Sequence, residues 1–420
     1  MKKPRRGPAG PRVTQAPTGH EGDHMRYVKI FDNIARQITR DGVAELGEGY
    51  KKTDDVNQAD AILVRASDIR DLDFGPNVRC VSRSGAGYNN IPIERCAKQG
   101  IVVFNTPGGN SNAVKELVVG MILVNSRGTL DGMRWVQSNA GDPQIVKDAE
   151  KNKKAFVGRE AIGRKVGVVG LGAVGSKVAN ALEALGLDVY GYDPYLSVEH
   201  AWQLNRNVKR VDSMAELCRN ADYVTLHVPS KDDTRHMMGA EMISLMSDGA
   251  MLINYARADI VDEPAVDAAL RSGKLGRFVC DFATPLTTKM PNTLITPHMG
   301  ACTAEAEANC ATMAVSQMKD YLEQGTIRNS VNYPDCDMGP CHTGGRIAAL
   351  HANVPNMIGQ ISGALAQSNA NIQRMSNEAQ DGSAYTLIDT DQPVDAATME
   401  KLRAIPGVYR IRQIVPAITR

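Results

Sequence analysis

Short apolar runs alternate with helix-compatible runs along most of this 420-residue chain. In one series, six strand candidates follow one another at regular spacing, from KVGVVG at Lys165 to the LITPH segment that ends at His298. This alternation is typical of a doubly wound parallel sheet. An earlier series, from Met25 to about residue 120, alternates in the same way. We therefore expect two Rossmann-like α/β domains.

The last part of the chain has a different order of elements. Its expected strands and helices form the series βαββαβ, at residues 346–351, 355–368, 371–375, 384–389, 396–404 and 408–414. This order predicts a small ferredoxin-like module. A polar stretch with Pro, Gly and Cys precedes the module and predicts a linker at 329–344.

Composition excludes several classes of protein. With 48 Lys+Arg against 47 Asp+Glu, the net charge of +1 gives no bulk attraction to nucleic acid or to an anionic membrane. The longest plain apolar run, residues 117–124, is far shorter than the roughly 20 residues of a membrane span. The eight cysteines lie mainly in apolar stretches, which predicts reduced, buried thiols and a cytoplasmic protein.

Two segments give no clear indication of a function. Residues 1–24 are rich in Pro, Gly and Arg and lack an apolar signal core, so we expect a disordered tail. Its basic residues leave open a contact with RNA or acidic lipid. Cys336, Cys341 and His342 are a weak metal candidate, because zinc needs four ligands and no second pair lies nearby. We therefore expect no metal.

A glycine-rich turn gives the clearest sign of a cofactor. Gly170, Gly172 and Gly175 follow an apolar strand and open a helix, which is the arrangement that binds a dinucleotide pyrophosphate. Asp193 ends the next strand, 18 residues after Gly175. A carboxylate there accepts hydrogen bonds from the ribose hydroxyls of NAD and repels the 2′-phosphate of NADP. The sequence therefore predicts NAD.

Two further residues follow strands of the same sheet. Arg257 comes after LINYA and His298 lies in ITPHMG. Ligands of open parallel sheets bind beyond the carboxyl ends of the strands, so both side chains are expected near the nicotinamide. Histidine is suited to take a proton from a hydroxyl group, and arginine binds a carboxylate with two hydrogen bonds. The pair predicts oxidation of a 2-hydroxy acid.

With these motifs in place, the chain resembles the D-isomer-specific 2-hydroxyacid dehydrogenases. The matching pieces are GLGAVG, LHVP (226–229), LINYARADIVDE (252–263) and ITPHMGACTAEAE (295–307). The resemblance implies further cofactor-binding residues, namely Ala173, Val174, His227, Val228, Pro229, Tyr255, Ala256, Asp281 and Gly300, besides Arg257 and His298. It also implies a discontinuous substrate-binding domain at 25–120 and 302–328, an NAD-binding domain at 121–301, and a regulatory module at 345–420.

The front segment, SRSGAGYNNIPIERCAKQGIVVFNTPGGNSNAVKEL (82–117), is similar to the phosphoglycerate dehydrogenase branch of that family. This implies 3-phosphoglycerate as substrate. The implied substrate-binding residues are Arg65, Ser67, Arg83, Gly85, Ala86, Gly87 and Asn110.

The C-terminal module resembles an ACT domain, a small-molecule-sensing fold. HANVP (351–355) and NANI (369–372) are similar to the serine-binding pattern of feedback-inhibited members. The resemblance implies that serine is an effector and that His351, Asn353 and Asn371 bind it. The serine would lie where the modules of two subunits meet in a homodimer or homotetramer. A purely structural dimerisation module is the alternative.

One departure from the family pattern leaves alternatives open. Most members have a glutamate a few residues after the Asp that Asp281 matches, but no Glu occurs between 264 and 304. Asp281 is then the local carboxylate that could support His298. A reductase for hydroxypyruvate or glyoxylate, or a non-catalytic NAD-sensing protein on this fold, remains an alternative to the expected dehydrogenase.

Overall fold

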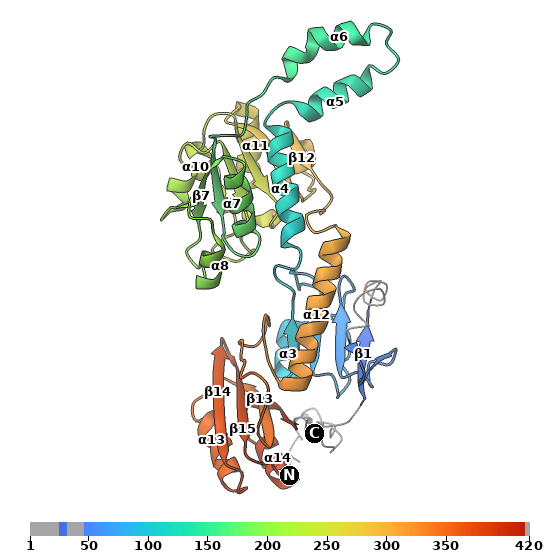
Figure 1. Ribbon diagram of the computed structural model, residues 1–420, viewed down its shortest axis with the longest axis vertical. Helices are drawn as coiled ribbons and strands as arrows, with labels where there is room; N and C mark the ends of the chain where they lie inside the picture. The colour runs from blue at the N-terminus through green and yellow to red at the C-terminus, as the bar shows by residue number, and fades with distance from the viewer. Residues whose placement is uncertain (1–24, 32–45, 416–420) are drawn as a thin grey trace, which may run out of the picture. The chain divides into compact units, whose positions relative to one another are not determined.

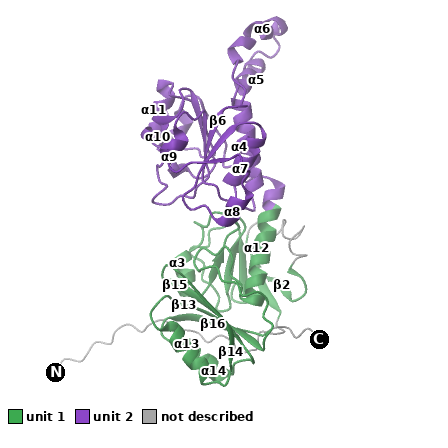
Figure 2. Cartoon of the chain, turned by 60° about the vertical axis from the view of Figure 1, so that its left-hand side comes forward, with its two compact units in different colours: residues 1–107, 308–420 green, residues 108–307 purple. Residues whose placement is uncertain are grey.

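The computed structural model describes residues 25–31 and 46–415 (Figure 1). The chain divides into two compact units, residues 1–107 with 308–420 and residues 108–307 (Figure 2). The tail expected at 1–24 lies outside the described residues. The helix α12 (Ala304–Gln324) begins in the second unit and continues into the first.

A parallel sheet of seven strands forms the centre of the unit at 108–307. In spatial order its strands are β12 (Thr293–Ile295), β11 (Leu275–Cys280), β10 (Ala250–Asn254), β9 (Tyr223–Leu226), β6 (Lys165–Val169), β7 (Asp188–Tyr192) and β8 (Lys209–Arg210). The sequence predicts six of these strands, and β8 is missed because it has only two exposed residues. The doubly wound order confirms the expected fold.

Helices cover both faces of this sheet. One apolar cluster joins α4 (Ser111–Asn125) and α7 (Gly175–Ala184) to the central strands. The other cluster joins the opposite face to α9 (Met214–Cys218), α10 (Ala240–Leu245) and α11 (Glu263–Ser272). The shorter elements are α8 (Val198–Gln203), η3 (Ala258–Ile260) and η4 (Thr287–Lys289).

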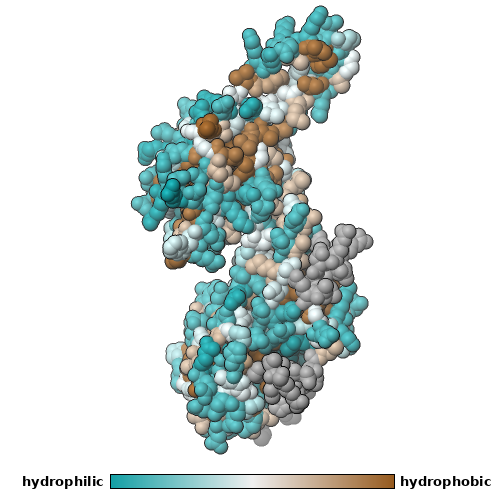
Figure 3. Space-filling model, viewed as in Figure 1, coloured by the Kyte–Doolittle hydropathy of each residue, from teal (hydrophilic) through white to brown (hydrophobic). Residues whose placement is uncertain are grey.

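A helical hairpin extends from this unit after α4. It consists of α5 (Thr129–Ser138), α6 (Ile145–Asn152) and η2 (Lys153–Phe156), and none of their residues is buried. The rings of Trp135 and Phe156 pack at a centroid distance of 6.2 Å and hold the hairpin together. Figure 3 shows apolar residues on this hairpin and beside α4.

The other unit begins with a parallel sheet. In spatial order its described strands are β2 (Tyr50–Thr53), β1 (Arg26–Ile30), β3 (Ala61–Val64), β4 (Cys80–Arg83) and β5 (Val102–Phe104), with α3 (Ile93–Lys98) before β5. The connection from β3 to β4, expected to be helix-compatible, contains turns and no helix. Its Gly75-Pro76 pair and several aspartates disfavour a helix there.

The C-terminal module has the predicted βαββαβ order. Its antiparallel sheet has the spatial order β14 (Ile372–Gln380), β15 (Ser383–Thr390), β13 (Gly345–Ala352) and β16 (Val408–Ile414). The helices α13 (Met357–Ala366) and α14 (Ala396–Arg403) pack on one face. The other face shares a core with α12, in which Leu350 and Leu387 join Val315 and Tyr321.

Side chains of the module satisfy the C-terminal end of α12. Arg412 donates to the carbonyls of Tyr321 and Leu322, and Arg346 donates to the carbonyl of Gln324. Cationic groups are favoured at this end of a helix because its last carbonyls lack helical partners. Arg346 is itself buried and forms a two-pronged ion pair with Asp389, at 2.6 and 3.0 Å.

The segment expected as a linker is packed into the protein. Tyr333, Cys336 and Cys341 are buried there, and Cys336 forms an antiparallel bridge with Ile327. All eight cysteines are free, and only Cys302 is exposed. Among the described helices, none has the length and apolarity to cross a lipid bilayer.

Candidate active site

Three neighbouring strands end in register at the carboxyl edge of the seven-stranded sheet. Asn254 pairs with Cys280, and Cys280 pairs with Ile295. Arg257, Asp281 and His298 therefore follow the ends of β10, β11 and β12. Because neighbouring strands lie about 4.8 Å apart, the strands that carry Arg257 and His298 are separated by about 10 Å. The predicted catalytic pair thus shares one edge of one sheet.

The side chain of Asn254 fixes the turn that carries Arg257. Its Oδ1 accepts from the backbone N–H of Ala256 at 3.1 Å, and its Nδ2 donates to the carbonyl of Arg257 at 2.7 Å. The guanidinium of Arg257 is half-buried and donates to the carbonyl of Ala256. No ion pair in the described chain uses Arg257, so its remaining donors suit an anionic ligand.

Asp281 organises the loop that carries His298. Its carboxylate is only 2% exposed and accepts from the Thr296 hydroxyl at 2.5 Å and from the N–H groups of Met299 and Gly300, both at 2.7 Å. A Cβ at position 300 would lie 3.1 Å from Asp281 Oδ2, which explains the glycine there. The sequence did not single out Thr296, which donates the shortest of these hydrogen bonds.

The backbone of His298 is left-handed, with φ of +58°. Its N–H donates to the carbonyls of Asp281 and Thr296 at 3.1 and 2.9 Å. The side chain is exposed, and the Phe282 ring lies edge-on to it at a centroid distance of 5.4 Å. Within the described residues, no carboxylate forms an ion pair with the imidazole.

The glycine-rich turn has the shape that a dinucleotide requires. Gly170 has φ of +84°, and a Cβ there would meet the carbonyl oxygen of His227 at 2.7 Å. A Cβ at Gly175 would lie 1.8 Å from the carbonyl oxygen of Gly170. By contrast, a Cβ at Gly172 would meet no protein atom within 4 Å. Gly172 therefore borders open space at the start of α7, and Ala173 and Val174 complete the turn.

Two backbone groups hold the carboxylate of Asp193. Leu171 N–H donates to Oδ2 at 2.8 Å and Tyr195 N–H donates to Oδ1 at 2.9 Å. The remaining lone pairs are free to accept from ribose hydroxyls. Tyr195, which the sequence analysis missed, is 80% exposed, and its hydroxyl lies 3.5 Å from Asp233 Oδ2 in the loop after β9. These groups fit NAD.

Two other predicted cofactor residues have shifted pKa values. Burial lowers the pKa of His227 to about 3, so its ring is neutral near pH 7. Its Nε2 lies 3.0 Å from the hydroxyl of Thr225, and Val228 and Pro229 follow it. Burial raises the pKa of Tyr255 to about 12, and its hydroxyl lies 3.5 Å from the hydroxyl of Thr296. Both residues are neutral parts of the site wall.

Most predicted substrate residues lie in the other unit, after neighbouring strands. Arg65 and Ser67 follow β3, and Arg83 ends β4 opposite Val64. Asn90 Nδ2 donates to the carbonyls of Arg65 and Ser67 at 3.3 and 2.8 Å. The sheet thus gathers two arginines and a serine at one edge.

The glycine loop at 85–87 follows β4. Gly85 has φ of +135°, its N–H donates to the Thr106 hydroxyl at 2.7 Å, and Asn105 Nδ2 donates to the carbonyl of Ala86. Gly87 is half-buried beside them. Asn110 lies in the unit at 108–307, at the N-terminal cap position of α4. The predicted substrate residues are therefore divided between the two units.

The predicted effector residues do not meet within one chain. Asn353 N–H bonds the carbonyl of Gly382 at one end of β15, and Asn371 N–H bonds Asp391 Oδ1 beyond its other end. At about 3.3 Å per residue, the eight residues of β15 separate these ends by roughly 23 Å. His351 is buried, with Nδ1 2.9 Å from the carbonyl of Ala352 and Nε2 2.8 Å from the Thr386 hydroxyl.

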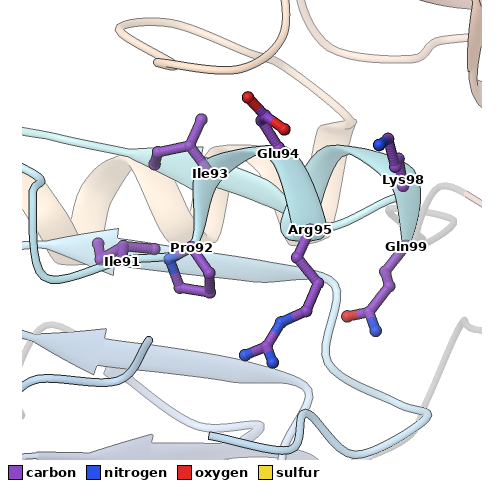
Figure 4. A pocket seen from close by; sticks show the side chains of 7 residues that line it. All are labelled: Ile91, Pro92, Ile93, Glu94, Arg95, Lys98 and Gln99. Carbon is purple, nitrogen blue, oxygen red and sulfur yellow. The ribbon is translucent and has the colours of Figure 1, made fainter. Parts of the chain in front are cut away.

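An open hollow of about 760 Å³ lies beside α3 (Figure 4). Arg95 lines it and donates to the carbonyls of Arg70 and Leu72. None of the predicted site residues lines this hollow. Among the described residues, no group of three His, Cys, Asp or Glu side chains is arranged to hold a metal ion.

Comparison with known proteins identifies the family. Residues 119–300 match the model of the D-isomer specific 2-hydroxyacid dehydrogenase, NAD binding domain. The D-3-phosphoglycerate dehydrogenase of Escherichia coli K12 is 34% identical over 340 residues, which cover 78% of this chain and 79% of that protein. The chain belongs to the D-isomer-specific 2-hydroxyacid dehydrogenase family. Its family membership confirms the resemblance and the NAD cofactor predicted from the sequence.

Two further relatives agree with this membership. The D-3-phosphoglycerate dehydrogenase of Methanocaldococcus jannaschii is 34% identical over 325 residues, covering 74% of this chain but only 58% of that relative. The crystal structure of NAD+-bound 3-phosphoglycerate dehydrogenase from Entamoeba histolytica superposes with a TM-score of 0.57 at 27% identity. It covers 73% of this chain and 98% of that chain.

Proposed function

We propose that this chain catalyses the NAD-dependent oxidation of D-3-phosphoglycerate to 3-phosphohydroxypyruvate, the first step of serine biosynthesis. The observation that carries the proposal is the placement of Arg257 and His298 after strands β10 and β12 of the sheet whose glycine turn and Asp193 fit NAD. The names of the relatives at 34% identity support the choice of substrate.

The residues divide the reaction between them. NAD supplies a hydride acceptor. His298 takes the proton of the substrate hydroxyl while the carbon that bears this hydroxyl loses a hydride, so that the C–OH group becomes a carbonyl group. Arg257 binds the substrate carboxylate and holds the carbon that loses hydride. In the reverse direction, His298 returns the proton to the carbonyl oxygen.

The phosphate of the substrate requires cationic and hydrogen-bonding groups. Arg65 and Arg83 supply guanidinium groups, which bind phosphate better than lysine does. Ser67 and Asn110 add polar side chains. The backbone N–H groups of Ala86 and Gly87 bind the substrate carboxylate in this proposal, while that of Gly85 holds the loop to the Thr106 hydroxyl. An unphosphorylated substrate would lack the anion that these two guanidinium groups bind in this proposal.

The test is NADH absorbance with NAD and 3-phosphoglycerate, with glycerate as the unphosphorylated control. We expect NADH with 3-phosphoglycerate and far less with glycerate. Faster reduction of hydroxypyruvate or glyoxylate in the reverse direction would replace this substrate with another 2-oxo acid. NAD binding without turnover of any of these acids would favour a non-catalytic NAD-sensing protein.

Serine regulation is proposed to need a second copy of the chain. Because Asn353 and Asn371 lie at opposite ends of the module, two modules joined edge to edge in antiparallel fashion would bring Asn353 of one beside Asn371 of the other. The edge strand β14 suits this pairing, since it is nine residues long and largely exposed. In this arrangement the buried His351 does not contact serine directly but holds the Thr386 hydroxyl below the binding site.

The helical hairpin offers a second contact between copies. Met133 is 54% exposed and Val136 is 49% exposed on α5, while Val146 and Val157 are about three-quarters exposed, at 77% and 76%. A monomer rarely leaves apolar residues gathered in this way. Two different two-fold contacts would close a homotetramer, whereas one would give a homodimer. The mainly buried thiols suit the cytoplasm, where we place the reaction.

Molecular mass in solution tests the assembly. Met133→Glu with Val136→Glu should halve the mass if the hairpin joins two copies. Asn353→Ala should relieve inhibition by serine without slowing the uninhibited reaction. If serine has no effect on the parent enzyme, the regulatory part of the proposal fails while the dehydrogenase assignment stands.

A further inference from the structure

Asp281 and Glu263, two acidic residues that contact the loops after β12 and β11, are engaged by other groups. No glutamate occurs between 264 and 304. The Asp281 carboxylate receives the Thr296 hydroxyl and two backbone N–H groups. Glu263, at the start of α11, receives the Thr284 hydroxyl on Oε2 at 2.8 Å. Among the described residues, no carboxylate forms an ion pair with the imidazole, whereas the ring of Phe282 contacts it.

Hydrogen bonds between two threonines fix the segment that follows Asp281. Thr284 N–H donates to Thr287 Oγ1 at 2.8 Å, and Thr287 N–H donates back to Thr284 Oγ1 at 3.0 Å. The Thr287 hydroxyl also lies 3.2 Å from the carbonyl of Phe282. Because Glu263 holds the same threonine pair, the backbone of Phe282 is tied to both the turn and α11.

The ring of Phe282 meets the ring of His298 in a defined geometry. The two centroids are 5.4 Å apart and the planes are inclined by 71°. This is an edge-to-face arrangement within the usual range for aromatic pairs. The torsion that turns an imidazole about its Cβ–Cγ bond is broad in the absence of contacts. In an exposed histidine, a fixed neighbouring ring is enough to narrow the range of this torsion angle.

We propose that Phe282 is a positioning residue for His298, and that an aromatic contact, rather than a carboxylate, orients the imidazole for proton transfer. The backbone of the loop is set by Asp281, and the rotation of the ring is set by Phe282. The proposal rests on the role of His298 in the proposed function. It assigns a task to a residue outside the predicted cofactor and substrate sets.

Three variants test the role of the ring. Phe282→Leu keeps an apolar side chain but removes the aromatic edge, and Phe282→Tyr keeps the ring. Phe278→Leu is the control, because it removes a buried ring from β11, the strand just before Phe282, and this ring forms no described contact with the ring of His298. All three are compared with the parent for kcat, KM and NAD affinity.

We expect Phe282→Leu to lower kcat by about tenfold to a hundredfold, since small misplacement of a reacting group has effects of this size. KM and NAD affinity should stay near the parent values, because Phe282 is expected to touch neither ligand. Phe282→Tyr should restore most of kcat. Equal losses in Phe282→Leu and Phe278→Leu, or a tyrosine variant as slow as the leucine variant, would overturn the proposal.

A second readout does not need turnover. The Cε1–H resonance of His298, assigned by its loss in His298→Asn, should move in Phe282→Leu because the ring current of the phenyl group is gone. It should stay in place in Phe278→Leu. If the resonance stays in place in both Phe282→Leu and Phe278→Leu, the contact between the rings of Phe282 and His298 is contradicted. A parent enzyme that oxidises no 2-hydroxy acid contradicts the proposed function instead, and the resonance still decides the position of the ring.

Discussion

The carboxylate oxygen Oδ2 of Asp281 accepts a 2.7 Å hydrogen bond from the backbone N–H of Gly300, nineteen residues further along the chain. Oδ1 accepts in the same way from Met299. Both donors directly follow His298, so one buried side chain just after β11 determines the path of the loop after β12. The position of His298, the proposed proton-transfer residue, thus depends on hydrogen bonds of its two neighbours as well as on those of its own N–H.

Replacing Asp281 with asparagine should damage both stability and turnover. An amide has one acceptor oxygen in place of two, so a backbone N–H would face an N–H₂ group and lose its partner. An unsatisfied buried group costs about 1–3 kcal/mol. Urea unfolding measures the loss, with Asp248→Asn as the control because Asp248 is 90% exposed. Equal stability of the two variants would contradict this role of Asp281.

His298→Asn should lower kcat by roughly 10² to 10⁴, the range of a general acid–base group, while NAD affinity is nearly kept. Asparagine tolerates the left-handed backbone of His298. His236→Asn is a matched control, because His236 is also exposed and has φ of +51°. Steady-state kinetics and NAD titration give the comparison. If NAD binding is lost instead of turnover, His298 has been misassigned.

Asp193→Asn should narrow the preference for NAD over NADP. The amide keeps an acceptor for only one of the N–H groups of Leu171 and Tyr195, and it removes the charge that repels a 2′-phosphate. Separate dissociation constants for NADH and NADPH, measured by fluorescence, test the change. A ratio that stays at the parent value would show that another group selects the cofactor.

The sequence predicts all strands of the two parallel sheets except β2 and β8, because buried parallel strands are short, continuous apolar runs and these two strands are not. Position along the chain also predicts that Arg257 and His298 follow strands at one edge of the sheet, since carboxyl ends of parallel strands meet there, and both residues lie at that edge. The two-residue strand β8 and the exposed hairpin have no such pattern. Their form depends on neighbours distant in sequence.

Side-chain partners are the part that sequence spacing does not determine. Asn353 and Asn371 match one binding pattern, yet the hairpin between β14 and β15 places them at opposite ends of a sheet. Thr296 and Phe282 carry no recognisable motif, because their roles arise from the meeting of two loops. Polar composition at 329–344 predicts a linker, but Tyr333 is buried in the shared core.

Arg346→Met should destabilise the protein by about 3–5 kcal/mol, because it leaves the Asp389 carboxylate buried and unpaired. It also removes the donor to the carbonyls of Gln324 and Gly339. The double variant Arg346→Met with Asp389→Leu should recover part of the loss. Urea unfolding provides the values.

The control for this pair is Arg210→Met, whose ion pair with Asp212 is 85% and 82% exposed and should contribute nothing measurable. A single variant at Arg346 as stable as this control would mean that the buried pair is dispensable.

The stability of the protein should fall as the pH drops from about 6.5 towards 3, in part because of His227. Burial lowers its folded-state pKa to about 3, while an unfolded histidine titrates near 6.5. The unfolded state binds the extra proton throughout this window, so its contribution to stability is complete above pH 6.5 and is lost on acidification.

The melting temperature of His227→Gln should therefore depend less on pH across that window than that of the parent. Burial also lowers the pKa of His351, so some acid sensitivity remains in the variant. If the melting temperatures of the parent and the variant fell by the same amount with decreasing pH, the assignment of a buried, neutral His227 would be wrong.

The end of helix α12 has a consequence for how the chain can be divided into fragments. Arg412, Arg346 and Tyr385 supply the donors for its last carbonyls and for Gly325, and the same module covers the apolar residues of that helix. A fragment that stops before Gly345 would expose both the helix end and a core face to water. The C-terminal module is thus part of the scaffold of the unit that also contains β1 to β5, and fragments for biophysical work should keep the two together.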